Sequence, residues 1–319
     1  MSSSKMGRLY NYNDYEYYGE LDYSNKPVGF GIMGKKYSGA VKVSSLFEAG
    51  KMNGFSMERD TSRQSCLGLY KNDIINGPYI EFVPGDLKFG MKYLGKPNPN
   101  IIYVFSATSF MISIFENGES TGKAINYKNG VLSYDLYKYG SNIKSVAIER
   151  NLDFSNNYPL NRMELKPYKS KEYYSYNDRD LVYVRQGDKK YDTDGYGFIV
   201  WKDDLSSCVT EFVDDERTGF GCYNFPNGDV FCGQFYSNKV SGFGFYGKNQ
   251  PFIISFGMFN NEKKKNGLCF EIEGTKLYIR KYSNNIKIGD SIEICLRTHN
   301  VKYYSTSGSI RSYEINNLL

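Results

Sequence analysis

Apolar and polar residues alternate along most of this chain in short runs, and turn residues separate the runs. Residues 219–235, GFGCYNFPNGDVFCGQF, show the pattern most clearly, because glycines and aromatic residues recur at alternate positions around Asn227 and Gly228. Alternate residues of a strand lie on one face of a sheet. Asn-Gly also supplies the positive φ angles that tight turns need. The pattern therefore predicts a β-hairpin whose loop is Asn227-Gly228-Asp229.

The predicted loop fixes which residues face each other across this hairpin. It places Tyr223 opposite Gly233 and Gly221 opposite Phe235. A glycine beneath an aromatic ring has no Cβ, so the ring can lie flat over the backbone. We therefore interpret these glycines as spaces for rings.

The same pattern recurs along the chain with a period of about 23 residues. An aromatic residue begins each block and a glycine closes it in residues 47–54, 70–77, 115–122, 212–219, 235–242 and 282–289. A unit this short cannot bury its own apolar face, so neighbouring units must stack in line. The predicted fold is all-β, an elongated single-layer twisted antiparallel sheet built from about a dozen tandem β-hairpins.

These hairpins are expected to form one continuous array over residues 1–319. The pattern is fair over residues 7–130, degenerate over 131–194 and clearest over 195–289. Residues 290–319 keep less of it and are expected to form a C-terminal cap or tail.

Composition supports strands rather than helices, since the chain holds 31 Tyr, 21 Phe and 32 Gly. The beginning of the sequence is polar and no apolar run is long enough to span a membrane, so we expect a cytoplasmic protein. The formal charge of +5 is modest and gives no reason to expect nucleic-acid binding.

The six cysteines have no CxxC spacing and the chain has a single histidine, so no metal site and no cofactor are predicted. In the predicted register, Cys222 and Cys232 are diagonal neighbours about 7–8 Å apart. That separation is too large for an unstrained disulfide. We therefore expect free thiols.

Residues 242–247, GFGFYG, match the dinucleotide-binding pattern G-x-G-x-x-G. That motif requires a helix directly after the glycines, whereas the residues here continue as a strand-like run. Gly242 and Gly244 also fall on the period of the other glycines. The structural interpretation is therefore preferred.

The repeated pattern resembles the MORN repeat (membrane occupation and recognition nexus). The resemblance implies a structural role for the following residues: Gly219, Gly221, Tyr223, Asn227, Gly228, Asp229, Phe231, Gly233, Phe235, Gly242 and Gly244. The pattern is specific for architecture and much less so for function.

The resemblance implies a non-enzymatic scaffold that mediates protein–protein interaction or self-association at a cytoskeletal, ciliary or cortical structure. The alternative is peripheral binding to acidic or phosphoinositide membranes, with Lys263, Lys264 and Lys265 as the lipid contact. Similar arrays can precede catalytic domains, but here the pattern leaves no room for one. We therefore predict no enzymatic activity.

Overall fold

The computed structural model describes residues 5–314 except for a set of short gaps and one longer gap between the two halves. The gaps are residues 7–9, 13, 36, 63, 84–85, 94–95, 107–108, 117–118, 153–168, 170–171, 178–180, 188–193, 249–250, 252, 261–263 and 299. The described residues form strands, turns and irregular segments and contain no helix. The all-β prediction is confirmed.

The strands form two antiparallel sheets in which consecutive strands are neighbours. The exception is at the start of the first sheet, where β1 and β2 both pair with β3. The first sheet has 14 strands: β1 (Lys5–Met6), β2 (Tyr10–Tyr12), β3 (Tyr15–Leu21), β4 (Pro27–Gly34), β5 (Val41–Glu48), β6 (Lys51–Arg59), β7 (Ser65–Lys71), β8 (Ile74–Val83), β9 (Asp86–Tyr93), β10 (Lys96–Ser106), β11 (Ser109–Glu116), β12 (Glu119–Lys128), β13 (Val131–Lys138) and β14 (Ser141–Glu149).

The second sheet has 13 strands in the order of the sequence. They are β15 (Glu172–Asn177), β16 (Leu181–Gly187), β17 (Gly195–Trp201), β18 (Ser207–Val213), β19 (Glu216–Asn224), β20 (Val230–Tyr236), β21 (Lys239–Lys248), β22 (Ile253–Asn260), β23 (Lys264–Glu273), β24 (Lys276–Ser283), β25 (Ile286–Cys295), β26 (Val301–Tyr304) and β27 (Ile310–Tyr313).

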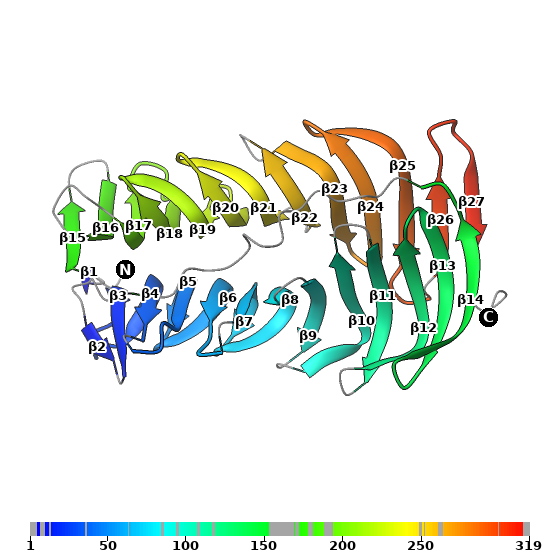
Figure 1. Cartoon of the computed structure of the whole chain (residues 1–319). Coiled ribbons are helices and arrows are strands. Elements are labelled where there is room, and N and C mark those ends of the chain that lie inside the picture. Colours follow the sequence, from blue (N-terminus) through cyan, green and yellow to red (C-terminus); the bar gives the residue numbers. More distant parts are fainter. Residues whose placement is uncertain are drawn as a thin grey trace.

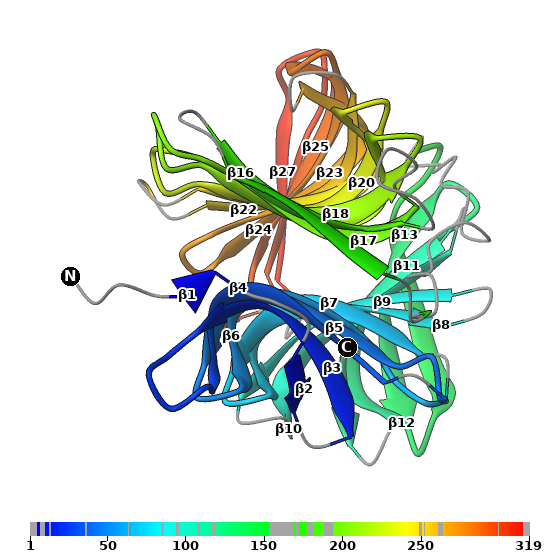
Figure 2. The ribbon, with the colours of Figure 1, turned by 90° about the vertical axis from the view of Figure 1, so that its left-hand side faces the viewer.

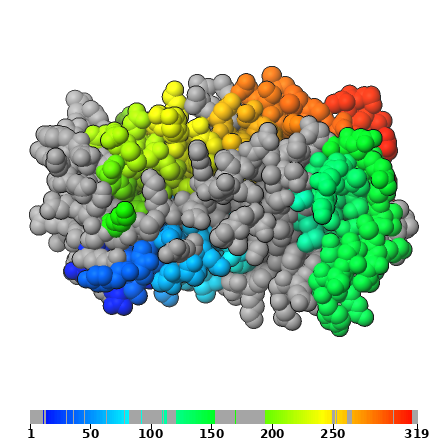
Figure 3. All heavy atoms as spheres, viewed as in Figure 1, coloured from blue at the N-terminus to red at the C-terminus, as the bar shows by residue number. Residues whose placement is uncertain are grey.

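The two sheets lie face to face as two layers, and the prediction of one single-layer sheet is wrong (Figures 1 and 2). One buried apolar cluster contains side chains from both sheets. The ring centroids of Phe55 and Phe245 lie 4.8 Å apart across the interface, and those of Tyr18 and Phe198 lie 6.3 Å apart. In the left part of the space-filling view, the described atoms of the second sheet lie above those of the first (Figure 3). Each sheet therefore has an inner face against its partner and an outer face.

The layers are also joined at the end of the molecule that carries β14 and β27 (Figure 1). Glu149 of the first sheet accepts a hydrogen bond from Arg311 at 2.9 Å and another from the hydroxyl of Tyr313. The hydroxyl of Tyr134 donates to the carbonyl oxygen of Tyr313 at 3.1 Å. These contacts align the last strands of the two sheets.

Tight two-residue turns join many of the strands, and they lie within the repeated blocks that begin with an aromatic residue and end with glycine. Both central residues have positive φ at Asn72-Asp73, Asp214-Asp215, Ser237-Asn238 and Asn284-Asn285. Two successive positive φ angles are typical of type I′ turns, whose twist matches that of the flanking strands. Each block is therefore itself a hairpin.

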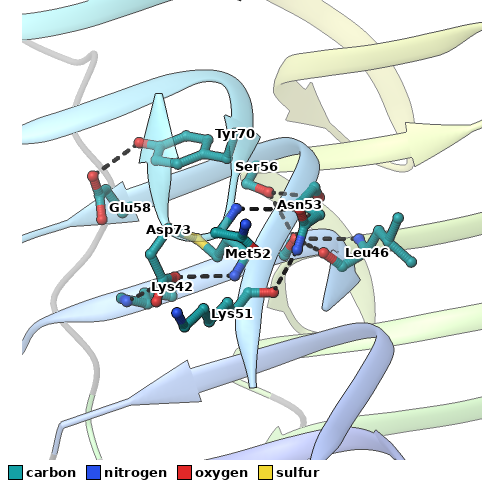
Figure 4. A network of polar contacts seen from close by, with 11 residues as sticks. Lys42, Leu46, Lys51, Met52, Asn53, Ser56, Glu58, Tyr70 and Asp73 are labelled. Carbon is teal, nitrogen blue, oxygen red and sulfur yellow. Dashed lines mark hydrogen bonds and ion pairs between the residues drawn. The ribbon is translucent and has the colours of Figure 1, made fainter. Parts of the chain in front are cut away.

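The second residue of such a turn also binds the strand that follows the previous turn. The Asp73 amide donates to the Met52 carbonyl at 3.0 Å, and the Met52 amide donates to Oδ1 of Asp73 at 3.0 Å (Figure 4). Asn238 makes the same two bonds with Arg217, at 3.1 and 2.9 Å. Only a short side chain with an acceptor oxygen can close this pair, which explains Asp or Asn at these positions.

The glycine that closes a block lies at an irregularity in the strand pairing. Between β18 and β19 the register shifts after Thr210, and Gly219 in the bulge has φ of 65°. Between β24 and β25 the register shifts after Arg280, and Gly289 in the bulge has φ of 67°. A bulge with a glycine at positive φ bends the strand and increases its twist. The closing glycine is therefore a bend in the sheet.

The observed hairpin of residues 219–235 differs in register from the predicted one. Phe225 and Asp229 close the loop, since the Phe225 amide donates to the Asp229 carbonyl at 2.9 Å. Tyr223 therefore faces Phe231, and Gly221 faces Gly233. The loop is Pro226-Asn227-Gly228, one residue earlier than predicted. Because its length stays odd, the repeated residues remain on one face.

The corrected register brings two cysteines directly opposite each other. Cys222 pairs with Cys232 across β19 and β20, and the two residues form a disulfide. Both are buried in the cluster between the sheets. The prediction that all cysteines are free is therefore wrong for this pair, because it rested on a register two residues away. Cys66, Cys208, Cys269 and Cys295 are free.

Alkylation of the denatured protein without reductant should modify the four free cysteines and spare Cys222 and Cys232. The disulfide spans a sequence separation of 10, so reduction should lower the free energy of unfolding by about 3 kcal/mol. Peptide mass spectrometry and denaturant titrations with and without reductant measure both effects. A variant with Cys222→Ala and Cys232→Ala should not respond to reductant. Alkylation of all six cysteines would contradict the assignment.

Candidate functional site

The outer face of the second sheet has its own aromatic cluster, separate from the core between the layers. Phe231 is fully buried there. Its ring makes edge contacts with the rings of Phe235 and Phe259, with centroid separations of 5.6 and 5.5 Å. A Cβ on Gly233 or Gly244 would lie 2.7 or 2.5 Å from Cζ of Phe231. The two glycines therefore make room for this ring. The predicted pairs are wrong, because the ring over Gly233 is that of Phe231 and not of Tyr223, and Gly221 faces Gly233 and not Phe235.

Half-buried rings extend this cluster as a row across the outer face. Trp201, Tyr223, Phe225 and Tyr246 follow one another with ring centroids 5.6, 4.5 and 6.0 Å apart. The guanidinium of Arg217 lies 5.5 Å from the Trp201 ring and 5.7 Å from the Tyr223 ring. We call the four rings the outer row. Half-buried aromatic and arginine side chains are the residue types that dominate binding energy at protein interfaces.

The outer row leads at Tyr246 into a cavity of 540 Å³, a size typical of ligand pockets. Strands β21 to β24 and the turn after β24 contribute its walls. We call it the outer cavity, and its lining residues are Tyr246, Lys248, Ile253, Ser255, Phe259, Lys265, Glu271, Glu273, Arg280, Tyr282 and Asn285.

A buried carboxylate organises the outer cavity. Glu271 accepts a hydrogen bond from Arg280 at 2.7 Å and one from the Tyr282 hydroxyl at 2.7 Å. It also forms an ion pair with Lys265 and accepts a longer bond from Ser255 at 3.3 Å. Burial opposes ionisation of this carboxyl, but the two cations and the tyrosine outweigh it and lower its pKa below the usual 4.5. The carboxylate therefore stays charged and holds its donors in place.

Replacing Glu271 by Gln should reduce stability at neutral pH and leave it unchanged in acid. A carboxyl whose pKa is lowered by folding stabilises the protein fully above its unfolded value, here 4.5, and loses this contribution as the pH falls through the folded value. The gap in unfolding free energy between wild type and variant should therefore close below pH 4.5. Denaturant titrations at several pH values measure it. Glu273→Gln, at an exposed position, is the control, and a gap independent of pH would contradict this role.

The hairpin loop that contains Asn227 and Gly228, together with Asp229 that closes it, supports Tyr246, where the outer row meets the outer cavity. Asp229 is buried, and it accepts bonds from Asn227 at 2.9 Å and from the Tyr246 hydroxyl at 2.5 Å. Gly228 has φ of 80°, which glycine adopts without strain. The loop therefore fixes the ring that the row and the cavity share.

The remaining predicted glycines, Gly219, Gly221 and Gly242, lie in strands β19 and β21. A Cβ on Gly219 would lie 2.4 Å from Glu211, one on Gly221 would lie 2.4 Å from Thr210, and one on Gly242 would lie 2.4 Å from Gln234. Each glycine therefore lies against a side chain of the neighbouring strand.

The structure describes the side chain of Lys265 among the three predicted lipid-contact lysines. Lys263 lies outside the described residues, and of Lys264 only the backbone is described, as the first residue of β23. Lys265 points into the outer cavity, where it pairs with Glu271 and lies 5.2 Å from the Tyr282 ring. Lys265 is thus part of the outer cavity.

The sequence pattern did not indicate Arg217, Glu271, Arg280 or Trp201 as functional residues. These side chains come from different strands, and nothing in their local spacing indicates that they meet. One available signal is that the polar residues of β23 and β24 alternate with apolar ones, which places them together on one face.

The outer face of the first sheet is packed differently. Its cluster contains Tyr17, Phe47, Met52 and Tyr70, and Tyr70 donates to Glu58 at 2.9 Å (Figure 4). Burial raises the pKa of Glu58 above its usual value, although Tyr70 and Lys42 oppose this effect. This face therefore buries its carboxylate without the two close cations that Glu271 has.

Among the described residues, no cluster of His, Cys, Asp and Glu could hold a metal ion, and no helix is long and apolar enough to cross a membrane.

No family model and no curated protein matches the chain. Among solved structures, the TCP10 domain of Danio rerio CPAP in complex with a peptide of Danio rerio STIL aligns with a TM-score of 0.21 and 8% sequence identity. The alignment covers 75% of this chain and 95% of that chain. A similarity this low carries no argument for the function of this chain.

Proposed function

We propose that this protein is a non-enzymatic scaffold that binds a segment of a partner protein along the outer row and into the outer cavity. The observation that carries the proposal is the continuity of the two features through Tyr246. Rigid aromatic side chains give a large contact area at a low cost in conformational entropy. A cavity at the end of the row then provides a place for an anchoring side chain.

The environment of Glu271 favours binding over catalysis. A general acid or base works best with a pKa near the operating pH. The pKa of Glu271 is instead lowered, and the donors that lower it occupy the carboxylate. The group is therefore suited to holding cations in position.

The architecture that we propose is two MORN-like arrays packed back to back. The recurring turns, the closing glycines at positive φ and the ring over Gly233 and Gly244 support it. A cytoplasmic location, and a cytoskeletal, ciliary or cortical setting, stay predictions from the sequence. Binding to acidic membranes has less support, because Lys265 lines the outer cavity and its side chain is only 22% exposed.

A random 16-residue peptide library displayed on phage tests the proposal on the full chain. We expect specific peptides to be enriched and to react with a photo-crosslinking phenylalanine placed at Lys248, which lines the cavity. Lys239 at the other end of β21 is the matched position, and a crosslinker there should capture little peptide. Failure to enrich any peptide, or equal capture at both positions, would overturn the proposal. Crosslinking between copies at Lys248 would indicate self-association through this face instead.

A further inference from the structure

We infer that the outer cavity selects a segment with an acidic side chain, whose carboxylate binds among Lys248, Lys265 and Arg280. This inference rests on the proposed function and names the chemistry of the partner. The lining contains three cationic side chains and two carboxylates. The cavity therefore has an excess of one positive charge.

The excess charge is available to a ligand because Glu271 does not use all the hydrogen-bond donors of Lys265 and Arg280. Glu271 already accepts four hydrogen bonds. An ammonium group carries three N–H donors and a guanidinium five, so Lys265 and Arg280 each use only part of their capacity on this carboxylate. Lys248 is exposed at the end of β21 and adds another ammonium group. The cavity thus offers more donors than acceptors.

The two inner cations are held in place before any ligand arrives. The guanidinium of Arg280 lies 3.9 Å from the centroid of the Tyr278 ring, and Lys265 lies 5.2 Å from that of Tyr282. Their side chains are 26% and 22% exposed. A carboxylate that enters here meets donors that are already ordered and partly desolvated, which strengthens the attraction.

The other walls suit the aliphatic part of an acidic residue. Ile253, Phe259 and the ring of Tyr246 provide apolar surface beside the cations. Glu273 lies two residues after Glu271 and is exposed, so it opposes the entry of a second acidic group. We therefore expect one dominant acidic position in a segment that is otherwise aromatic or neutral.

Three labelled peptides of twelve residues, with alternating Tyr and Ser, test this selectivity by fluorescence anisotropy. They carry Glu, Gln or Lys in place of one central Ser. The Glu peptide should bind at least fivefold more tightly than the Gln peptide at 50 mM NaCl, and the Lys peptide should bind most weakly. The difference should shrink at 500 mM NaCl, because salt screens charges that are partly exposed.

Charge reversal on β21 locates the effect. Lys248→Glu should weaken binding of the Glu peptide at least fivefold and change binding of the Gln peptide less than twofold. Lys239→Glu makes the same change in net charge outside the cavity and should leave all three affinities unchanged. Circular dichroism should show unchanged melting for both variants, since both lysines are exposed.

The outcomes separate this inference from the proposed function. Equal binding of the Glu and Gln peptides, or equal effects of the two variants, would overturn the acidic selectivity and leave segment binding intact. Absence of binding by all three peptides, together with no enrichment from the random library, would overturn both. Sedimentation with phosphatidylserine vesicles that Lys248→Glu abolishes, without peptide binding, would assign the cations to a membrane instead.

Discussion

Phe231→Ala is expected to lower the free energy of unfolding by about 3–5 kcal/mol, the range for truncating a buried phenylalanine. The ring is fully buried and packs edge-on against Phe235 and Phe259. It also covers Gly233 and Gly244, which cannot fill the space that it would leave. Denaturant unfolding followed by circular dichroism measures the loss.

Tyr236→Ala is the control for this prediction, because that aromatic residue lies on the same strand and is 70% exposed. Its effect should stay within about 0.5 kcal/mol. A loss below about 1 kcal/mol for Phe231→Ala would show that the ring does not organise the outer face, and the structural interpretation of the glycines would fail with it.

The local chemistry of the hairpins could be predicted from the sequence because it depends on a few backbone requirements. The closing glycines are needed where φ is positive in a bulge, as at Gly219 and Gly289. That a ring lies over Gly233 follows from alternation of faces and from the absence of Cβ, but the ring is that of Phe231 and not of Tyr223 as predicted. Such requirements act over a few residues, so a repeated pattern reveals them.

The register could not be fixed in the same way. Loops at residues 226–228 and 227–229 both have odd length and place the same residues on the same face. The hydrogen bond from the Phe225 amide to the Asp229 carbonyl closes the loop and selects residues 226–228. Asp229 is held in this position because it is buried and bonded to Asn227 and Tyr246. The facing pair Cys222 and Cys232 was missed for this reason.

The sequence does contain an indication of the second layer, at positions outside the repeated pattern. Residues between the repeated positions, such as Cys222, Cys232, Phe243 and Phe245, are also apolar. A strand that is apolar on both faces is buried on both faces. The partner surface is far away in the sequence, however, so alternation alone does not say what covers it. The outer cavity depends in turn on side chains from four strands, which no local motif brings together.

Phe198→Ala is expected to destabilise both sheets together, by about 3–5 kcal/mol. Phe198 is fully buried between the layers and lies 6.3 Å from the Tyr18 ring of the first sheet. Trp201 is the single tryptophan, so its fluorescence reports unfolding of the second sheet. Burial raises the pKa of the Cys66 thiol to about 12, so alkylation of this residue reports opening of the first sheet.

The two reporters should shift to lower denaturant concentrations by the same amount, because the layers share one apolar cluster. Peptide mass spectrometry resolves alkylation of Cys66 from that of the other thiols. Tyr23→Ala, at a position that is 74% exposed, should move neither midpoint. A shift in Trp201 fluorescence without a shift in Cys66 alkylation would mean that each sheet unfolds by itself. Coincident shifts would mean instead that the core between the sheets stabilises them as one unit, so that each outer face keeps its shape only while the two layers remain packed.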